Sequence, residues 1–599
     1  MKNLIEIKRE MGVISLASFH PGFILIFFGI FSLVFSMFCK CNSKLVSYIT
    51  VGGSLIAFLA TLILEDKDSW IINITEEIKL SLLNVDNLSK LFAVIFGFIA
   101  LVSSIYSLNP LTKSFEKAVS LIYAGASMSV VLSDDWISFI VFWELMAVTS
   151  MYMVYAGDSK DAKRASFRYM VMHFTAGNLI MAGAIFIIKS GNYELLPLTY
   201  SGGPQYWLIL IGLLINCAMF PFHTWLPDSY PEANPSGTVY MGSFTTKVAI
   251  YSLIRLFSGT EEFAVYGALV AIFAALMAFI ENDIRRLLSY HIVSQLGMML
   301  SSIAIGDKAG DMAAAFHASF NILYKGVLLM IAGAIFYMTG KKNISDLGGI
   351  LKRNPIISIC FFIASLCIAG FPLTNGYVSK GMITAVLTSH GYIATYYLIM
   401  IAGIGTWISI TMKINYFVFI KPSKTLTSGE TKEIPAAMNI AIVATTTVCL
   451  ITGFLYGRIE TVSGFNLSSL LTASHICEYL FMFVAATVPF VLLRKKVEPH
   501  EGLNLDIDIA YRIGLSRLLL GLSSLVNNIF EIFERWFGYF KYWIYIVLKY
   551  PQIIAGEIPD MKERTRDEME EVPTSVGGMI NALIFFAIVA FIVLVSIEG

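Results

Sequence analysis

Residues 318–336 read ASFNILYKGVLLMIAGAIF, an apolar run interrupted by a single charged residue, Lys325. Crossing about 30 Å of hydrocarbon takes roughly 20 apolar residues in a helix, because every backbone amide there must be hydrogen-bonded within the chain. This run therefore predicts a transmembrane helix that carries an ionisable group. Similar runs recur along the whole sequence, so we expect an all-α polytopic membrane protein.

The composition supports this fold class, since 57% of the 599 residues are hydrophobic and only 14% are charged. We expect about 16 transmembrane helices. They are placed near residues 21–38, 45–64, 88–107, 117–133, 136–156, 165–188, 206–222, 236–257, 262–281, 287–305, 312–337, 354–387, 393–419, 435–456, 475–494 and 579–597.

Several classes of function are excluded by the sequence. The 42 basic and 42 acidic residues balance, so no nucleic-acid partner is expected. The seven cysteines are scattered, and the close pair Cys39 and Cys41 lacks the spacing of a metal or iron–sulfur cluster. Nucleotide and zinc motifs such as GxGxxG, GxxxxGK[ST] and HExxH are missing. We therefore expect no cofactor and no metal. The start of the chain lacks a signal-peptide cleavage site, so the first span is expected to remain.

Lysine and arginine are concentrated in alternate loops, which indicates the orientation because basic residues are retained on the cytoplasmic side. We expect a multi-pass protein of the cell (inner or plasma) membrane, with both termini on the outer face and residues 497–578 in the cytoplasm. The basic loops contain Lys40, Lys44, Lys113, Lys160, Lys163, Arg164, Arg285, Arg286, Lys341, Lys342, Lys352, Arg353, Lys421, Lys424, Lys432 and residues 494–496.

Two spans contain a proline where a helix would break, at Pro221 and at Pro372. The order of spans from 117 to 257 also recurs weakly from 262 to 419, and paired broken helices in two halves indicate an inverted-repeat transporter. The expected domains are peripheral spans (1–116), a first half-channel (117–257), a second half-channel (258–420), C-terminal spans (421–496), a lateral amphipathic segment (497–578) and an anchoring span (579–599).

Four charged residues fall inside expected spans: Glu144, Lys247, Lys325 and Lys380. A charge at the bilayer centre costs about 2.5–3.5 kcal/mol on insertion scales, so each is a candidate for function. Burial disfavours the charged form and an opposite charge favours it, so a movable partner could drive proton uptake and release. The alternative is a static ion pair that holds helices together.

Histidines provide further candidates. His317, Asn321 and Lys325 follow each other at four-residue spacing and share one helical face, which suits a proton relay or a simple helix-end hydrogen bond. His173 and His291 fit packing better than function. His223, beside Pro221, is expected to brace the broken helix.

The same residues resemble a known family, the antiporter-like proton-translocating subunits of respiratory complex I, membrane-bound hydrogenases and multisubunit Na+/H+ antiporters. The likeness covers roughly residues 85–420. It is carried by FWELMAVTSMYMV (142–154), PFHTWLPDSYPEANPSGTV (221–239), NDIRRLLSYHIVSQLGMML (282–300), AAFHASFNILYKGVLLMIAGAI (314–335) and FPLTNGYVSKGMI (371–383).

The resemblance implies proton-translocating roles for Glu144, Lys247, His317, Lys325 and Lys380. One position departs from the family pattern: a lysine is usual five residues before the proline of the first break, where it pairs with the glutamate, but this sequence has Asn216. Either Lys247 becomes the partner of Glu144, or this half-channel is altered or silent.

The C-terminal part resembles two further features of the family. GLNLDIDIAYRIG (502–514) is similar to the D-type antiporter and hydrogenase branch. From about 515 an amphipathic stretch and the charged run DMKERTRDEMEE (560–571) lead to the last span, an arrangement that resembles a lateral helix with its anchor. The alternative is a seventeenth, tilted span at 536–550. The apolar stripe contains Leu522, Leu525, Ile529, Phe533, Trp536, Phe540, Trp543 and Val547.

We therefore expect a subunit that translocates protons, with sodium as a second candidate ion, in a redox-driven complex such as a membrane-bound hydrogenase or an NADH:quinone oxidoreductase. Other membrane subunits would be its partners, and the chain would not be catalytic alone. The alternative is a subunit of a multisubunit Na+/H+ antiporter without redox partners. A purely structural scaffold would not need several intramembrane charges.

Overall fold

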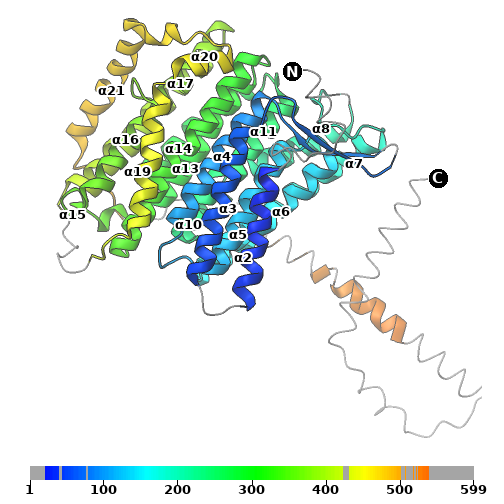
Figure 1. Ribbon diagram of the computed structural model, residues 1–599. Helices are drawn as coiled ribbons and strands as arrows, with labels where there is room; N and C mark the ends of the chain where they lie inside the picture. Colours follow the sequence, from blue (N-terminus) through cyan, green and yellow to red (C-terminus); the bar gives the residue numbers. More distant parts are fainter. Residues whose placement is uncertain are drawn as a thin grey trace, which may run out of the picture. The chain divides into compact units, whose positions relative to one another are not determined.

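The computed structural model describes residues 20–38, 43–75, 78–200, 202–422, 431–500, 506–507, 517, 521, 524–525 and 527–538. The chain divides into two units, Met1–Ile507 and Asp508–Gly599. The described part of the first unit is a bundle of helices with one small hairpin (Figure 1).

The helices and strands of the first unit follow in chain order. They are α2 (Pro21–Phe38), α3 (Ser43–Ile63), β1 (Ser69–Asn73), β2 (Lys79–Asn84), α4 (Asn87–Tyr106), α5 (Ser114–Leu132), α6 (Trp136–Tyr155), α7 (Lys160–Lys189), α8 (Pro204–Asn216), α9 (Trp225–Ser229), η2 (Tyr230–Glu232), α10 (Pro235–Ser243), α11 (Thr245–Phe257), α12 (Phe263–Ile280), α13 (Ile284–Ile303), α14 (Lys308–Thr339), η3 (Ile344–Asp346), α15 (Ile350–Arg353), α16 (Pro355–Ala369), α17 (Asn375–Ser389), α18 (Ile393–Thr406), the π-helix η4 (Trp407–Ile420), α19 (Ala436–Gly453), α20 (Tyr456–Ser463), η5 (Leu467–Leu471) and α21 (Ala473–Leu493).

The prediction of an all-helical polytopic membrane protein is confirmed. Among the described residues, ten helices are long and apolar enough to cross a membrane, and three shorter apolar helices are Pro21–Met37, Pro204–Asn216 and Pro355–Ala369. The number of sixteen spans is not established, and the expected anchoring span at 579–597 lies outside the described residues, as do Cys39, Cys41, Lys40 and Lys424.

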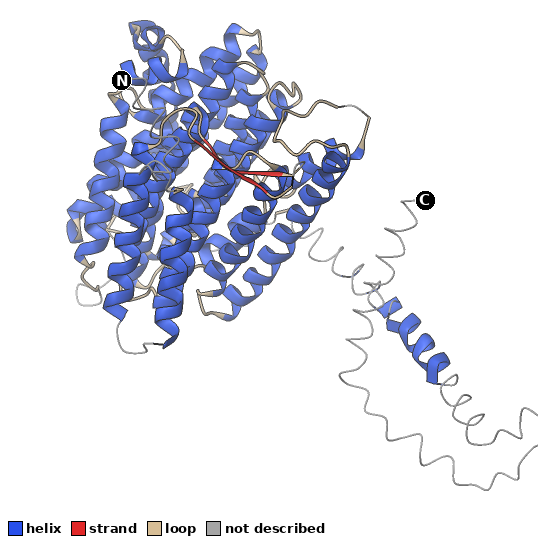
Figure 2. Cartoon of the chain, turned by 45° about the vertical axis from the view of Figure 1, so that its right-hand side comes forward, coloured by secondary structure: helices blue, strands red, loops and turns tan. Residues whose placement is uncertain are grey.

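A two-stranded antiparallel hairpin interrupts the helical order between α3 and α4 (Figure 2). β1 pairs with β2 through partners such as Trp70 with Leu83, and the register shifts between Trp70 and Ile71. Its strands contain the β-favouring residues SWIIN and KLSLLN, but the polar linker around them carries no sharp hairpin signal. The hairpin was not predicted from the sequence.

Helix α14 forms the centre of the first unit. It packs against α4, α10, α13, α16, α17 and α19, and residues 312–335 along it are buried without interruption. Side chains of residues 312–335 therefore face protein on every side.

Helices α12 and α13 approach each other backbone to backbone. A Cβ added at Gly267 would lie 2.4 Å from the carbonyl oxygen of Gly297, and the reverse contact has the same length.

Three helices are interrupted. α8 ends at Asn216 and α9 begins at Trp225, with Pro221 between them, while α16 ends at Ala369 before Pro372 and α17. The expected span at 236–257 is covered by α10 and α11, with an unpredicted interruption at Phe244, where no proline marks the break. There the amide of Thr245 donates to the Tyr123 hydroxyl (3.0 Å) instead of continuing the helix ladder.

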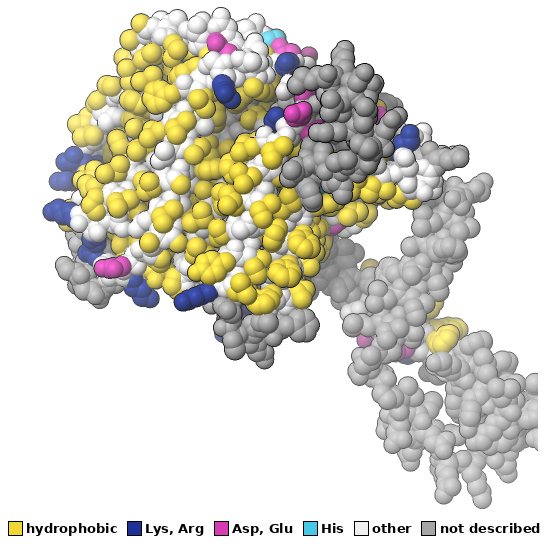
Figure 3. Space-filling model, viewed as in Figure 1, with side chains coloured by type: hydrophobic (Ala, Val, Ile, Leu, Met, Phe, Trp, Pro, Cys, Tyr) yellow, Lys and Arg dark blue, Asp and Glu magenta, His cyan; other side chains and the backbone are white. Residues whose placement is uncertain are grey.

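The outer surface of the first unit fits a lipid environment. Figure 3 shows hydrophobic side chains over the middle of one face, with Lys and Arg along its lower left edge. Basic loops from different parts of the chain meet acidic ones on one side, since Lys113 pairs with Asp158 at 3.0 Å and Lys342 with Glu232 at 3.4 Å.

In the second unit, the described residues 517, 521, 524–525 and 527–538 are helical. Leu525, Ile529, Phe533 and Trp536 are 46–72% exposed, and Glu531 pairs with Arg535 one turn along the helix at 3.5 Å. These residues fit the expected amphipathic helix. Leu522, Phe540, Trp543 and Val547 lie outside the described residues, and the lateral role stays a prediction.

Candidate functional site: a row of buried lysines

Lys325 lies at the centre of the bundle on α14 and is 0% exposed. Its Nζ donates to the carbonyl oxygen of Leu288 on α13 at 3.2 Å. Lys247 and Lys380 are the charged groups that act on Lys325 electrostatically. Two of the three lysines predicted from the sequence therefore lie within electrostatic range of the third, Lys325.

Lys247 is placed by the unpredicted break between α10 and α11. Its Nζ donates to the carbonyl of Gly242 at 2.7 Å and to the Thr246 hydroxyl at 3.2 Å. The neighbouring carbonyl of Met241 accepts from the Tyr230 hydroxyl at 2.8 Å. Side chains thus satisfy backbone groups that the interrupted helix leaves free.

Lys380 is held in the same way in the second half. It lies on α17, just after the break at Pro372, and its Nζ donates to the carbonyls of Ile368 (2.7 Å) and Ala369 (3.4 Å). These carbonyls end α16, where the helix dipole carries partial negative charge and favours a cation. Gly370 leaves room for the lysine stem, since a Cβ there would lie 3.0 Å from Lys380 Cδ.

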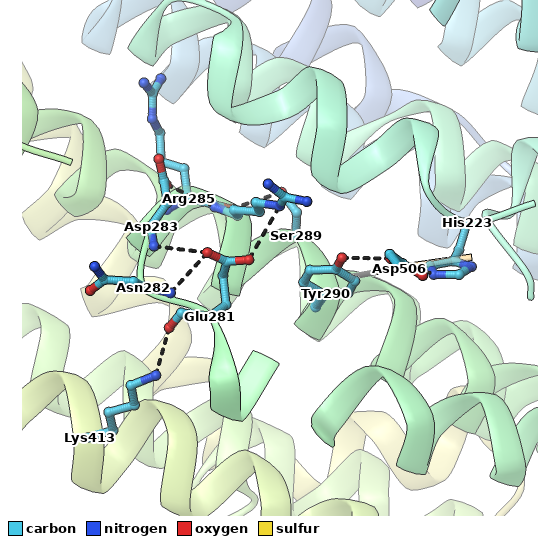
Figure 4. A network of polar contacts seen from close by, with 10 residues as sticks. His223, Glu281, Asn282, Asp283, Arg285, Ser289, Tyr290, Lys413 and Asp506 are labelled. Carbon is cyan, nitrogen blue, oxygen red and sulfur yellow. Dashed lines mark hydrogen bonds and ion pairs between the residues drawn. The ribbon is translucent and has the colours of Figure 1, made fainter. Parts of the chain in front are cut away.

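Lys413, in η4, was missed by the sequence analysis. Its Nζ donates to the carbonyls of Phe279 and Glu281, both at 2.6 Å, at the C-terminal end of α12 (Figure 4). It is 3% exposed. The signal was present, because Lys413 is an ionisable residue inside the expected span 393–419, but it lies close to the end of that span.

None of these lysines forms an ion pair with a described acidic side chain. The static ion pair considered as an alternative is therefore not found within the described ranges. Backbone carbonyls at helix ends and breaks hold Lys247, Lys380 and Lys413, and a mid-helix carbonyl holds Lys325. Each of these cations is buried with dipoles as its polar partners.

The histidines connect the helices around this row. His317 Nδ1 lies 2.9 Å from the Ser379 hydroxyl of α17, and His291 Nε2 lies 2.7 Å from the Ser409 hydroxyl of η4. Both rings are 0% exposed. His317, Asn321 and Lys325 are all buried, but they face different neighbours, because Asn321 donates to Tyr324 at 3.3 Å.

The first half also contains Glu144, the acid predicted from the sequence. Glu144, on α6, is half-buried and lies over Gly177 of α7, where an added Cβ would come within 2.0 Å of Glu144 Oε1. No ion pair joins Glu144 to Lys247 or to another described residue. Asn216 is 0% exposed at the end of α8 and donates to Gly212 at 3.2 Å. Its neighbour His173 stacks on Tyr169 at 3.9 Å between ring centroids.

A second feature that the sequence did not reveal is a buried acid near the first break (Figure 4). His223 Nε2 lies 3.2 Å from Asp506 Oδ2, and the Tyr290 hydroxyl donates to the same oxygen at 2.6 Å. Burial by itself would raise the pKa of the Asp506 carboxyl, but the hydrogen bonds from His223 and Tyr290 and the charge of His223 lower it overall. Asp506 lies more than 280 positions from His223, so their contact could not be read from spacing.

The loop between α12 and α13 forms the other part of this polar network. The Glu281 carboxylate accepts from the amides of Asn282 (2.9 Å) and Asp283 (3.2 Å) and lies 3.3 Å from Arg286. Asp283 caps α13 by accepting from the Arg285 amide at 2.8 Å. No cluster suited to a metal ion occurs among the residues that the structure describes.

The fold and the row define the class: a polytopic membrane protein with buried ionisable side chains along its interior. Residues 133–409 match the model of the family described as NADH:quinone oxidoreductase/Mrp antiporter, transmembrane region. The resemblance expected from the sequence is thereby confirmed over these residues, which are similar to that antiporter-like family.

Two relatives extend this comparison. An uncharacterized protein of Methanocaldococcus jannaschii is 29% identical over 366 residues, which covers 57% of this chain and 75% of the relative. The D subunit of the Na+/H+ antiporter of Bacillus subtilis is 26% identical over 322 residues, which covers 50% of this chain and 65% of the relative. The match to the Bacillus protein thus spans just under two thirds of its length.

Two solved structures share the fold. A chain of the Mrp complex from Dietzia sp. DQ12-45-1b has a TM-score of 0.67 at 19% identity, over 74% of this chain and 96% of that chain. A chain of the membrane-bound sulfane sulfur reductase, an archaeal respiratory membrane complex, has a TM-score of 0.66 at 19% identity, over 77% and 100%. At this identity the likeness concerns the fold.

Proposed function

We propose that this chain is the proton-translocating, antiporter-like subunit of a redox-driven membrane complex related to complex I. The observation that carries the proposal is the row of buried lysines whose described partners are backbone carbonyls instead of carboxylates. A cation that is not locked to an acid can lose and regain its proton when a neighbouring charge changes. Lys247, Lys325 and Lys380 would pass that change along the axis.

The other predicted residues would complete the path. Glu144 would exchange protons beside Gly177 at the edge of the first half, and His317 would connect α14 to α17 through Ser379. In this proposal the first half-channel spans residues 117–257 and the second spans 258–420. Asn216 alters the first half, because an amide neither gains nor loses a proton at neutral pH.

A second candidate function is a subunit of a multisubunit Na+/H+ antiporter without redox partners. The name of the Bacillus subtilis relative favours it, whereas the archaeal respiratory complex among the structural neighbours supports the redox-driven reading. The same row of lysines would serve both functions, with sodium exchanged for protons in the second.

The proposed orientation places the basic loops in the cytoplasm. Its support is the meeting of Lys113, Asp158, Glu232 and Lys342 on one side of the bundle. A single cysteine near Lys342 should react only with a reagent applied from the cytoplasm, and one near Gly391 only from outside. The reverse labelling pattern would invert the topology.

The residues 497–578 are proposed as a lateral segment that binds neighbouring subunits through its apolar stripe. Burying such a stripe contributes about 25 cal/mol per Å² of apolar area, before the cost of ordering is counted. Deletion from about residue 515 should release partner subunits on native gels while the helical core still inserts. An intact, coupled complex without the segment would contradict this role.

Purification of the intact complex in mild detergent tests the function. Co-eluting quinone-reducing or hydrogenase subunits, with proton uptake into vesicles that depends on the electron donor, would support the redox-driven complex. Sodium-dependent proton movement without such subunits would favour the antiporter. Vesicles that move neither ion would contradict both.

A further inference from the structure

The side chain of Asp506 lies within the first unit, next to the interrupted helix of the first half. Its side chain is 2% exposed, and that of His223 is 0% exposed. Tyr290, on α13, completes the group through its hydroxyl, 2.6 Å from Asp506 Oδ2 (Figure 4). The residues come from three separate parts of the chain.

This pair differs from the other ion pairs between described residues, because both of its side chains are buried. The next most buried pairs, Arg168 with Asp228 and Arg286 with Glu281, each have a basic partner that is 36% exposed. A buried pair of charges is costly to desolvate. Histidine and aspartate can avoid that cost, since moving one proton across the 3.2 Å contact converts the ion pair into two neutral groups.

The second ring nitrogen of His223 is free to continue such a transfer. Nδ1 is buried and has no hydrogen-bond partner among the described residues. The ring lies between aromatic side chains, with centroid distances of 5.7 Å to Phe220 and 5.1 Å to Phe273. His223 thus has Nε2 on an acid and Nδ1 available for a further partner, which suits a proton relay. This role goes beyond the bracing role that the sequence favoured.

We propose that Asp506 and His223 exchange a proton at the first helix break, so that the segment after α21 supplies a proton-carrying carboxylate to the first half. In this step the Nε2–H bond of the imidazolium breaks and an O–H bond forms on Asp506 Oδ2, and the reverse step restores the ion pair. The ionisable groups that face the pair are Tyr290 and, beside Tyr290, Arg286. This inference rests on the proposed proton translocation.

The test compares proton flux of the complex in vesicles for Asp506→Asn and Asp506→Glu. Asparagine can still accept hydrogen bonds from Tyr290 and His223, so a purely bracing role would survive that change. We expect Asp506→Asn to lower flux about tenfold, as removal of a proton-transfer group typically does, while Asp506→Glu stays within about threefold of wild type. Asp158→Asn, which removes a carboxylate that is 63% exposed, is the matched control and should have no effect.

Lys325→Ala, measured in the same vesicles, distinguishes a failure of the proton exchange from a failure of the proposed proton translocation. If Lys325→Ala abolishes flux and Asp506→Asn retains wild-type flux, the exchange is overturned and the proposed function stands. If neither change affects flux, the proposed function fails. Should Asp506→Asn not assemble, His223→Gln takes its place, since it keeps an amide donor toward Asp506, and full flux in that variant would overturn the exchange.

Discussion

Both halves of the bundle hold a lysine on backbone carbonyls, but their other charged groups differ. In the second half, Lys380 and Lys413 donate to carbonyls at the ends of α16 and α12, as Lys247 does at Gly242 in the first half. In the first half, Glu144 lies against a glycine of α7 and His223 meets an acid that follows α21. The first half therefore adds an acid and a histidine whose positions depend on side-chain packing.

This difference predicts that the two kinds of site in the proposed path respond differently to substitution. A carbonyl at a helix end is positioned by the backbone and needs no second side chain to hold it. The acid sites of the first half depend on close contacts that one methyl group or one amide could disturb. The first half should accordingly be the more sensitive to conservative substitutions.

The largest effect is expected from Lys325→Ala, because Lys325 interacts electrostatically with Lys247 of the first half and with Lys380 of the second. Loss of the central ionisable group should lower proton flux about tenfold or more, whereas folding should persist because no ion pair is broken. Flux into vesicles, normalised to folded protein, measures this. Lys189→Ala, at an exposed position on α7, is the control, and equal flux in the two variants would refute the central role.

Gly177→Ala should have the next largest effect and tests the sensitivity of the first half. The added Cβ would meet Glu144 Oε1 at 2.0 Å, so the flexible carboxylate must move away while the helices remain packed. We expect flux to fall several-fold, close to the value for Glu144→Gln. Gly52→Ala, where nothing lies within 4 Å, is the matched control. Wild-type flux in Gly177→Ala would show that the position of Glu144 is not critical.

Asn216→Lys should have a moderate effect of the opposite sign. Asn216 is fully buried at the end of α8 beside His173, and a lysine there would add a second cation near Lys247, which interacts electrostatically with the adjacent Cys217. If the missing cation limits transfer from Glu144, flux should rise about twofold. Unchanged flux in a well-folded variant would indicate that the first half works without a basic group at this position.

The smallest effect concerns the pH dependence of stability. Because the pKa of Asp506 is lowered in the folded protein, its carboxylate contributes stability at neutral pH that is lost as the pH falls through that value. Asp506→Asn should lower the melting temperature by about 2–4 °C at pH 7, with the difference shrinking as the medium is acidified through the lowered pKa of Asp506. Thermal unfolding of the purified protein measures it. A difference that grows on acidification would contradict the assignment.

Most spans could be predicted from the sequence because a run of apolar residues long enough to cross a bilayer has few other structures available. The expected span 21–38 coincides with α2, and 393–419 coincides with α18 plus η4 to within one residue. The breaks beside Pro221 and Pro372 also had a local cause in proline chemistry. Contacts between residues far apart in the sequence had no local signal of this kind.

The break at Phe244 was missed because it is stabilised by side chains from elsewhere, above all the Tyr123 hydroxyl that replaces a helix acceptor. Asp506 was missed as a site residue for the same reason, since its partners His223 and Tyr290 are determined only when the helices pack. Lys325 could be found from sequence because a charge in an apolar run stands out by itself. Its acceptor, the Leu288 carbonyl, could not.

The carbonyl partners of the lysines have an electrical consequence. A neutral amine still has N–H groups to donate, so the bond from Lys380 to the Ile368 carbonyl can persist whether or not the amine carries a charge. The hydrogen bond therefore keeps the side chain in place while its charge changes. A carboxylate partner would instead bind the charged form far more strongly than the neutral one, and it would have to be released in every cycle.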